Sequence, residues 1–423
     1  MSDIRFEGWL HRSGTGGVYQ DSAGNVGIAS TQPQTRLDIG NGGFQVGPTG
    51  IATVTTINTT NLINGTPLTN RNLIINGAMH IAQRATSSTT SGYGDVDRWQ
   101  HEYAGNDEAP TFAQVSLTTS DTPYTLGLTK AFKITNGNQT SGLQATSQIN
   151  FMQPIEAQNI RNSGWNYKSS SSYITLSYWV RASVTQEYHG FVKTADGSNY
   201  AYPFSLGTLS ANTWTKITKT IPGNSNLQID DNNGAGFQVW PVAFYGTNYT
   251  NDSITENAWA AWASGNRSHD QTATWWTTND STFEITGVQL ELGSVATPFE
   301  HYSYGDELAR CQRYFCKAAE KGGSDHSVAL GANYSGSNAF IHVTFPVTMR
   351  TTPTLDQLTG TNYYRYFSNG GYETFDDMNS LDTATATPEG VEVLKSGISI
   401  TQGSAGFLRY QHASAEIRFT AEL

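Results

Sequence analysis

The sequence predicts an all-β protein of several domains, and three observations support this. Only 14% of the 423 residues are charged, whereas 42 Gly, 54 Thr and 31 Asn enrich the chain in small polar residues and aromatic residues reach 12%. Apolar and polar residues alternate over several segments, which is the period of a half-buried strand. Turn clusters rich in Gly and Asn separate these segments. A chain this long exceeds one typical domain and indicates two to four.

Composition also excludes several classes of protein. The net charge of -11 leaves no basic footprint for nucleic acid. No apolar run approaches the roughly 18 residues of a membrane span, and the first residues lack the apolar core of a signal peptide. Neither membrane insertion nor nucleic-acid binding is therefore expected.

The two cysteines, Cys311 and Cys316, indicate a reducing compartment. On one helix they would point about 140° apart and could not pair without breaking the helix. We interpret both as small buried apolar residues. No Cys/His set has metal-site spacing, so no metal and no cofactor are expected. Asp230–Asn233 offers oxygen atoms to Ca²⁺ but is interpreted as a turn.

Residues 1–70 are predicted to form a β arm and shaft. Val18–Ile28 is predicted to be a hairpin with its turn at Asp21–Asn25. Thr53–Thr60 is β-branched but too polar to build a core, and Asn61–Gly65 is echoed by Asn72–Gly77. A strand segment this thin cannot cover its own apolar face, so we expect other chains to complete it.

Residues 71–303 are predicted to form a sandwich or jelly roll. Between residues 174 and 184, one set of alternate positions is apolar: Ile174, Leu176, Tyr178, Val180, Ala182 and Val184. This pattern predicts a half-buried strand. In the later strand over 283–292 the apolar face changes parity at Gly287, which predicts a bulge.

Residues 304–322 are predicted to be a short linking helix, and residues 323–423 a C-terminal β domain. Gly305–Lys317 opens with acidic and closes with basic residues, matching the helix dipole, and Gly322-Gly323 would end the helix. Strand alternation covers residues 341–347 and 415–423. The predicted fold is thus arm and shaft, jelly roll, linking helix and C-terminal β-sandwich.

Several segments together resemble bacteriophage tail fibres of the marine phage and cyanophage type. They are Gly17–Ile28, Leu37–Ile39, Asn72–Met79, Ile81–Arg84, Asp97–Trp99, Ile285–Gly293, Ala296–Glu300, Tyr304–Tyr314, Phe345–Arg350 and Ala421–Leu423. The block over 285–314 is the most specific, because several short motifs recur there in order. The resemblance implies a homotrimeric virion appendage with a jelly-roll domain that binds the host surface.

Glycan binding would use exposed aromatic faces for stacking, with amides, carboxylates and Arg bonding the hydroxyls. Three clusters offer such residues. The first holds Trp240, Tyr245 and Tyr249, the second Trp259, Trp262, Trp275 and Trp276 around Arg267, and the third Tyr363, Tyr364, Arg365, Tyr366 and Tyr372. Core packing is the alternative for Trp259 and Trp262. Adjacent residues on a strand face opposite ways, so Trp275-Trp276 would include one exposed platform.

An enzyme would need positioned carboxylates, and the glycosidase pattern sets two of them about 5–10 Å apart. Asp95 with Asp97, Glu102 with Asp107, and Asp376 with Asp377 are candidates that nothing distinguishes from turn residues. Asp97 next to Arg98 is interpreted as a structural ion pair. No nucleophile elbow or zinc-protease helix occurs, so no catalytic residue is assigned and no enzyme is expected.

The expected function is that of a phage tail fibre subunit. It would be made in the host bacterial cytoplasm, attach to virion proteins by its N-terminal arm, and bind host polysaccharide or lipopolysaccharide as a homotrimer. Weak contacts multiplied over three chains would give avidity. A purely structural virion protein, such as a tail connector or head fibre, and a polysaccharide-depolymerising tailspike remain alternatives.

Overall fold

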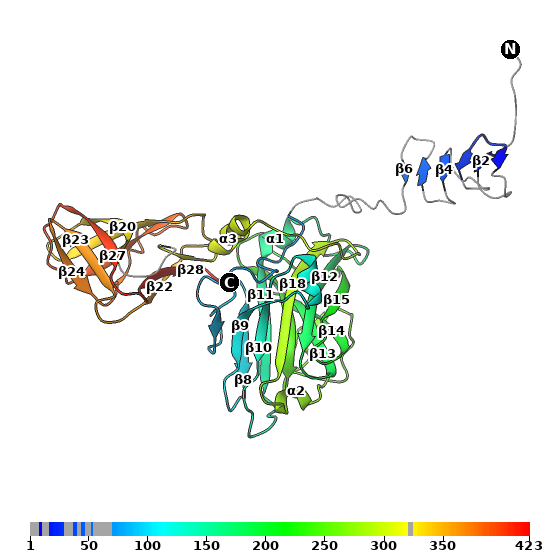
Figure 1. Cartoon of the computed structure of the whole chain (residues 1–423), viewed down its shortest axis with the longest axis horizontal. Coiled ribbons are helices and arrows are strands. Elements are labelled where there is room, and N and C mark those ends of the chain that lie inside the picture. Colours follow the sequence, from blue (N-terminus) through cyan, green and yellow to red (C-terminus); the bar gives the residue numbers. More distant parts are fainter. Residues whose placement is uncertain are drawn as a thin grey trace, which may run out of the picture. The chain divides into compact units, whose positions relative to one another are not determined.

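The computed structural model describes residues 8–10, 17–28, 37–39, 44–46, 52–53, 70–319 and 325–423. Its contacts divide the chain into two compact units, Met1–Leu68 and Thr69–Leu423. In both units the regular secondary structure of the described residues is mostly strand, as the sequence predicted (Figure 1). The described helices are α1 (Ala157–Arg161), α2 (Thr274–Thr277), α3 (Tyr304–Gln312) and one 3₁₀ turn, η1 (Thr122–Leu126).

The first unit contains a sheet of six short strands in sequence order. They are β1 (Gly8–Leu10), β2 (Gly17–Gln20), β3 (Val26–Ile28), β4 (Leu37–Ile39), β5 (Phe44–Val46) and β6 (Ala52–Thr53). The predicted hairpin is confirmed as β2 and β3, because Asp21 Oδ1 accepts the N–H groups of Ala23 and Asn25, each at 2.9 Å. The predicted run beyond Thr53 and the segment Asn61–Gly65 lie outside the described residues.

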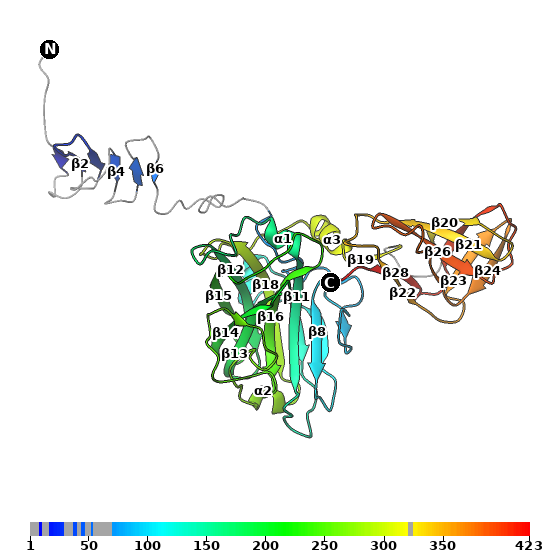
Figure 2. The same ribbon diagram turned by 180° about the vertical axis from the view of Figure 1, so that it is seen from behind.

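A sandwich of two six-stranded antiparallel sheets follows. Sheet I has the order β15-β12-β18-β10-β9-β7 and sheet II the order β17-β14-β13-β16-β11-β8 (Figure 1, Figure 2). Sheet I contains β7 (Ser87–Ser88), β9 (Thr111–Ser116), β10 (Lys130–Thr135), β12 (Tyr173–Ala182), β15 (Thr215–Pro222) and β18 (Thr282–Leu292). Sheet II contains β8 (Gln100–Ala104), β11 (Gln148–Glu156), β13 (Gln186–Thr194), β14 (Tyr200–Leu209), β16 (Ala235–Tyr245) and β17 (Ala260–Ala261). From β10 to β18 the chain crosses repeatedly between the sheets, as in a jelly roll.

Strand β12 lies inside sheet I and is covered on both faces. Its alternating apolar residues from Ile174 to Ala182 are at most 1% exposed and face sheet II. On the other face Thr175 and Ser177 are also buried, and Trp179 packs against a small cluster containing Trp214. The predicted strand is therefore confirmed, but its half-buried character is wrong, because neighbouring loops cover the second face.

The predicted bulge at Gly287 is confirmed. The pairing of β12 with β18 shifts register between Ser177 and Trp179. Gly287 has φ +61°, a left-handed conformation that favours glycine. An added Cβ would lie 2.6 Å from Leu128 Cδ1, so both backbone and space require glycine here.

Helix α3 is shorter than predicted. Ser303 caps it, since its Oγ accepts the Asp306 N–H at 3.2 Å, and it ends at Gln312. Phe315–Lys317 forms β19 and pairs with β28, so the predicted helix to Lys317 is wrong: strand pairing overrides local propensity. Cys311 lies on α3 and Cys316 on β19, both free and buried as predicted, while Gly322-Gly323 lies outside the described residues.

The C-terminal residues form two further sheets around one core. Sheet III has the order β24-β23-β27-β20-β21-β26-β25, and sheet IV the order β19-β28-β22. Sheet III contains β20 (His326–Asn333), β21 (Asn338–Thr344), β23 (Tyr364–Ser368), β24 (Gly371–Phe375), β25 (Ser380–Leu381), β26 (Gly390–Ser396) and β27 (Ala405–Tyr410). Sheet IV contains β19 (Phe315–Lys317), β22 (Thr354–Leu358) and β28 (Glu416–Thr420). The predicted alternation is confirmed, because Ile341, Ile417 and Phe419 are fully buried between these sheets.

No described helix is long and apolar enough to span a membrane. Among the residues outside the masked gaps, no group of three or more His, Cys, Asp or Glu side chains is placed to hold a metal ion. At 230–234, Asn232 Oδ1 accepts the Gly234 N–H at 2.8 Å, which is a local turn contact.

Candidate functional site

The four tryptophans of the second predicted cluster, Trp259, Trp262, Trp275 and Trp276, do not lie together in the structure. Trp275 and Trp276 lie on α2 at one end of the sandwich and both are fully buried (Figure 1). Their Nε1 atoms donate to the carbonyls of Thr282 and Gly142, at 3.0 and 3.2 Å. The predicted exposed platform is therefore wrong, because it assumed a strand, whereas one turn of helix directs both rings into the core.

Trp259 is a half-buried member of the sandwich core. It packs on Tyr202 and Phe237, at ring separations of 5.4 and 6.4 Å. Its Nε1 donates to the Pro222 carbonyl at 2.7 Å. The core-packing alternative therefore describes Trp259, while Trp262 joins the first cluster instead.

The outer face of sheet II, turned away from the core, carries an aromatic cluster. Phe191 on β13 is paired with Trp240 on β16, and their rings stack at 5.2 Å. Trp262 packs on Phe191 at 5.6 Å, and Tyr249 packs on Tyr245 at 5.4 Å. Trp240 and Tyr245 are buried, whereas Tyr249 and Trp262 are only partly buried. We call these five residues the sheet II cluster.

Two cations lie over the sheet II cluster. The Arg267 guanidinium lies 4.5 Å from the Tyr249 ring, 5.1 Å from Tyr245 and 5.3 Å from Trp262, and its Nη1 donates to the Tyr245 hydroxyl at 3.2 Å. Lys193 Nζ lies 4.7 Å from the Trp262 ring. Burial lowers the pKa of Lys193, and Arg267 lowers it further, while Glu102 opposes both. Such cation–π contacts hold the rings in fixed orientations.

Glu102 and Asn150 supply the polar groups of the same face. They are paired across β8 and β11, and Asn150 is paired with Val242 on β16. Burial raises the pKa of Glu102, opposed by Arg267 and Lys193. Asn150 is fully buried, and neither its Oδ1 nor its Nδ2 has a hydrogen-bond partner among the described residues. An unpaired buried amide costs about 1–3 kcal/mol.

The long connection over residues 246–273 carries Tyr249, Trp262 and Arg267 onto this face. It is tied to the sheet, since Glu256 Oε1 lies 3.1 Å from His189 Nδ1 on β13. Sequence reasoning missed Phe191, Lys193 and Asn150; the available signal was that Phe191-Val192 makes both faces of β13 apolar.

The third cluster is divided between the two faces of sheet III. Tyr364 and Tyr366 are fully buried, and their hydroxyls donate to the Glu416 carbonyl and to Asn333 Oδ1, each at 2.9 Å. Tyr363 stacks on the His412 ring at 4.4 Å. Only Arg365 and Tyr372 face outward, where Tyr372 is 57% exposed. Tyr364 and Tyr366 are therefore core residues and offer no exposed face.

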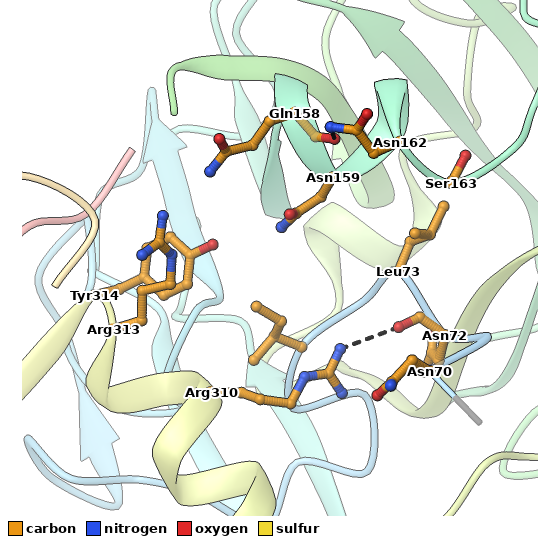
Figure 3. A pocket seen from close by; sticks show the side chains of 11 residues that line it. Asn70, Asn72, Leu73, Gln158, Asn159, Asn162, Ser163, Arg310, Arg313 and Tyr314 are labelled. Atoms are coloured by element: carbon orange, nitrogen blue, oxygen red, sulfur yellow. Dashed lines mark hydrogen bonds between the residues drawn. The ribbon is translucent and has the colours of Figure 1, made fainter. Parts of the chain in front are cut away.

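A cavity of about 490 Å³ lies between α1, α3 and the segment that opens the sandwich. Figure 3 shows amides from α1, including Asn159, facing Arg310 and Arg313 across it. Arg310 Nη2 donates to the Asn72 carbonyl at 3.1 Å, and Arg313 forms a two-pronged ion pair with Glu156 at 2.7 and 2.8 Å. Arg310 and Arg313 thus hold α3 to the sandwich, and no sequence-predicted site residue lines the cavity.

Several of the candidate carboxylates make structural contacts. Asp97 Oδ1 accepts the Gln83 N–H at 2.9 Å, and Asp107 Oδ1 accepts the Ser141 hydroxyl at 2.8 Å. Arg98 pairs with Glu422, so the predicted Asp97–Arg98 ion pair is wrong. The side chain of Asp377 pairs with Lys395 at 3.1 Å.

No protein-family model matches this chain, and no curated protein matches it. Similar solved structures include the enzymatically active domain of tailspike protein 4 of bacteriophage CBA120, at 12% identity over 52% of this chain and 21% of that one, with TM-score 0.28. A family 4 carbohydrate-binding module matches at 12% identity over 52% of this chain and 98% of that one, with TM-score 0.28. The cellulose-binding domain of a Cellulomonas fimi β-1,4-glucanase matches at 11% identity over 51% and 97%, with TM-score 0.26.

These similarities are of structure, at sequence identities of 11–12%. The match spans about a fifth of the tailspike chain. That this chain belongs to the tail fibres of marine phages and cyanophages stays a prediction.

Proposed function

We propose that this protein is a bacteriophage tail fibre subunit that binds a host-surface glycan without cleaving it. The observation that carries the proposal is the sheet II cluster, where two partly buried rings, two cations and an unpaired buried amide converge on one sheet face. Sugar rings stack on aromatic faces, and their hydroxyl groups both donate and accept hydrogen bonds. For a sugar hydroxyl to reach the fully buried Asn150, the side chains that cover it would have to move aside; its Oδ1 would then accept and its Nδ2 would donate hydrogen bonds.

The sheet II cluster places these groups in complementary roles. The exposed sides of Trp262 and Tyr249 would stack against the sugar, while Arg267 keeps both rings oriented. Glu102 lies on the next strand to Asn150 and would accept hydroxyl hydrogens. Each contact is weak, and the proposed homotrimer would multiply them into avidity.

The direct test is binding of the purified full chain to immobilised host polysaccharide and lipopolysaccharide. Trp262→Ala should weaken binding about tenfold, since losing one aromatic contact of roughly 1.4 kcal/mol changes the affinity that much. Tyr124→Ala, on η1 and 37% exposed, is the matched control and should bind like the unaltered protein. Unchanged binding of Trp262→Ala would contradict the proposed site.

Further experiments separate the alternatives. The free protein should block phage adsorption; no competition would favour a structural virion protein. New reducing ends after incubation with host polysaccharide would favour a depolymerising tailspike. In solution the mass should be three times 46.0 kDa, and a strict monomer would contradict the fibre assembly. Location in the virion tail would follow from a map of the assembled particle.

A further inference from the structure

The outer face of sheet III carries a row of apolar side chains across four neighbouring strands. Phe367 on β23 is paired with Tyr372 on β24 and with Phe407 on β27, and Phe407 is paired with Leu330 on β20. Leu330 is 75% exposed and Tyr372 57% exposed. The Phe367 and Phe407 rings stack at 4.9 Å, and Tyr372 packs on Phe367 at 5.4 Å. We call these four residues the sheet III row.

The sheet III row lies on the face of sheet III that is turned away from the core. The intervening residues of β23 and β27, which include Tyr366 and Leu408, point inward and are fully buried. Alternate residues of a strand face opposite sides, so the outer row contributes little to that packing. Exposed apolar residues gathered in one patch generally mark an interaction site.

Two arginines lie directly opposite each other beside the row. Arg365 is paired with Arg409 across β23 and β27, and like charges in that position destabilise a sheet. Arg365 is partly compensated, since its Nε donates to Gln411 Oε1 at 2.8 Å and its Nη1 lies 3.5 Å from Asp325 Oδ1. A bound anion would therefore offset the repulsion between the two guanidinium groups.

Arg409 is the uncompensated member of the pair. Within the described residues its side chain makes no ion pair and no hydrogen bond, and its Nε is buried without a partner. Its guanidinium instead lies 5.0 Å from the ring centres of both Phe367 and Phe407. A hollow of about 300 Å³ beside it is lined by Ser327–Leu330, Phe407 and Arg409. That volume lies at the lower end of the roughly 300–1,000 Å³ typical of ligand pockets.

We propose that this face binds an acidic polysaccharide. Sugar rings would lie along the sheet III row, and a carboxylate or sulfate group would bind Arg409 and Arg365, where a two-pronged contact suits a guanidinium. Charge complementarity selects this occupant: the face presents two adjacent cations in a chain of net charge -11. A second copy approaching with the same face would set arginines against arginines. The site lies on a sheet separate from the sheet II cluster, so it can be tested independently of the proposed function.

The test measures binding of the full chain to polygalacturonate, dextran sulfate and neutral dextran. The first two separate carboxylate from sulfate recognition, and binding to either supports the proposal. Arg409→Gln should weaken that binding at least about tenfold, and Tyr372→Ala about three- to tenfold. Lys216→Gln, an exposed strand residue of sheet I, removes the same charge and should leave binding unchanged.

Several results would overturn the proposal. One is that neutral dextran binds as well as the acidic polysaccharides, and another is that Arg409→Gln binds the acidic polysaccharides as well as the unaltered protein does. The third is that Tyr372→Ala binds them unchanged, which would mean that only attraction of a polyanion is involved. Dissociation of an oligomer on Arg409→Gln would show instead that this face joins copies of the chain. Because removing one of two facing cations relieves repulsion, Arg409→Gln should not lower the melting temperature. Trp262→Ala should retain acidic-glycan binding here, which separates failure of this site from failure of the sheet II cluster.

Discussion

At the scale of single residues, two side chains with strongly shifted pKa values, Asp95 and His101, belong neither to the sheet II cluster nor to the sheet III row. Asp95 is 1% exposed and lies 3.6 Å from His101, which is fully buried. Burial raises the pKa of Asp95 to about 7, with Asp97 adding to the effect and Arg84 opposing it. Burial lowers the pKa of His101 to about 4. The folded protein therefore favours a protonated Asp95 and a neutral His101.

This arrangement makes stability depend on pH in a defined direction. Because the folded protein holds the Asp95 proton more tightly than the unfolded chain does, the contribution of Asp95 falls between about pH 4 and 7. Asp95→Asn removes that loss while keeping an acceptor for the Val96 N–H. Relative to the unaltered protein, it should gain about 2–3 kcal/mol of unfolding free energy between pH 5 and pH 8.

Urea unfolding at the two pH values measures this gain. His101 titrates in the opposite direction and contributes to both proteins, so the difference between them isolates Asp95. Asp280→Asn, on an exposed turn, is the control for losing a carboxylate at the surface. A constant difference between Asp95→Asn and the unaltered protein at both pH values would contradict the assignment.

At the scale of elements, strand pairing decides where local patterns end. Phe315–Lys317 continues a helical pattern in the sequence, yet it pairs with β28. Trp275-Trp276 fits a strand by composition, yet it forms α2. For Phe315–Lys317 the partner lies far along the chain, and a local pattern holds no information about it.

The bulge in β18 gives a prediction at this scale. Gly287→Ala places a Cβ 2.6 Å from Leu128 Cδ1 and strains a residue with φ +61°. Gly207 has φ +79° with nothing within 4 Å of an added Cβ. Gly287→Ala should therefore destabilise by about 2–4 kcal/mol and Gly207→Ala by about 1–2 kcal/mol. Thermal unfolding of the two variants would test this, and equal losses would exclude the contact with Leu128 as a cause.

At the scale of the whole molecule, the C-terminal end is joined to residues near the start of the sandwich. Glu422, 7% exposed in its side chain, pairs with Arg98 and lies 3.2 Å from Arg84. Arg98 is 1% exposed, and its Nη2 donates to the Pro154 carbonyl at 2.8 Å. Its guanidinium also lies 3.5 Å from the Tyr314 ring. Residues more than 300 positions apart thus share one buried ionic network.

Breaking this network should be costly. Glu422→Gln leaves Arg98 buried with its charge uncompensated, so we expect a loss of about 3–5 kcal/mol in unfolding free energy. Glu373→Gln removes a carboxylate from β24 outside this network and should change stability little. Denaturant unfolding measures both variants. A loss below about 1 kcal/mol for Glu422→Gln would mean that the pair is solvated.

The sequence by itself determined the strand-rich class, the hairpin at Asp21, the bulge at Gly287 and the free buried state of both cysteines. Each follows from a period of two, from turn chemistry or from composition, which are properties of neighbouring residues. Only the tertiary structure decided which aromatic residues meet. Tyr249, Trp262 and Arg267 reach sheet II because a long connection folds over it, and Phe191 and Asn150 join them through strand register. Burial and register depend on partners distant in the chain, so a candidate list drawn from sequence mixes core rings such as Trp276 with surface rings such as Tyr372.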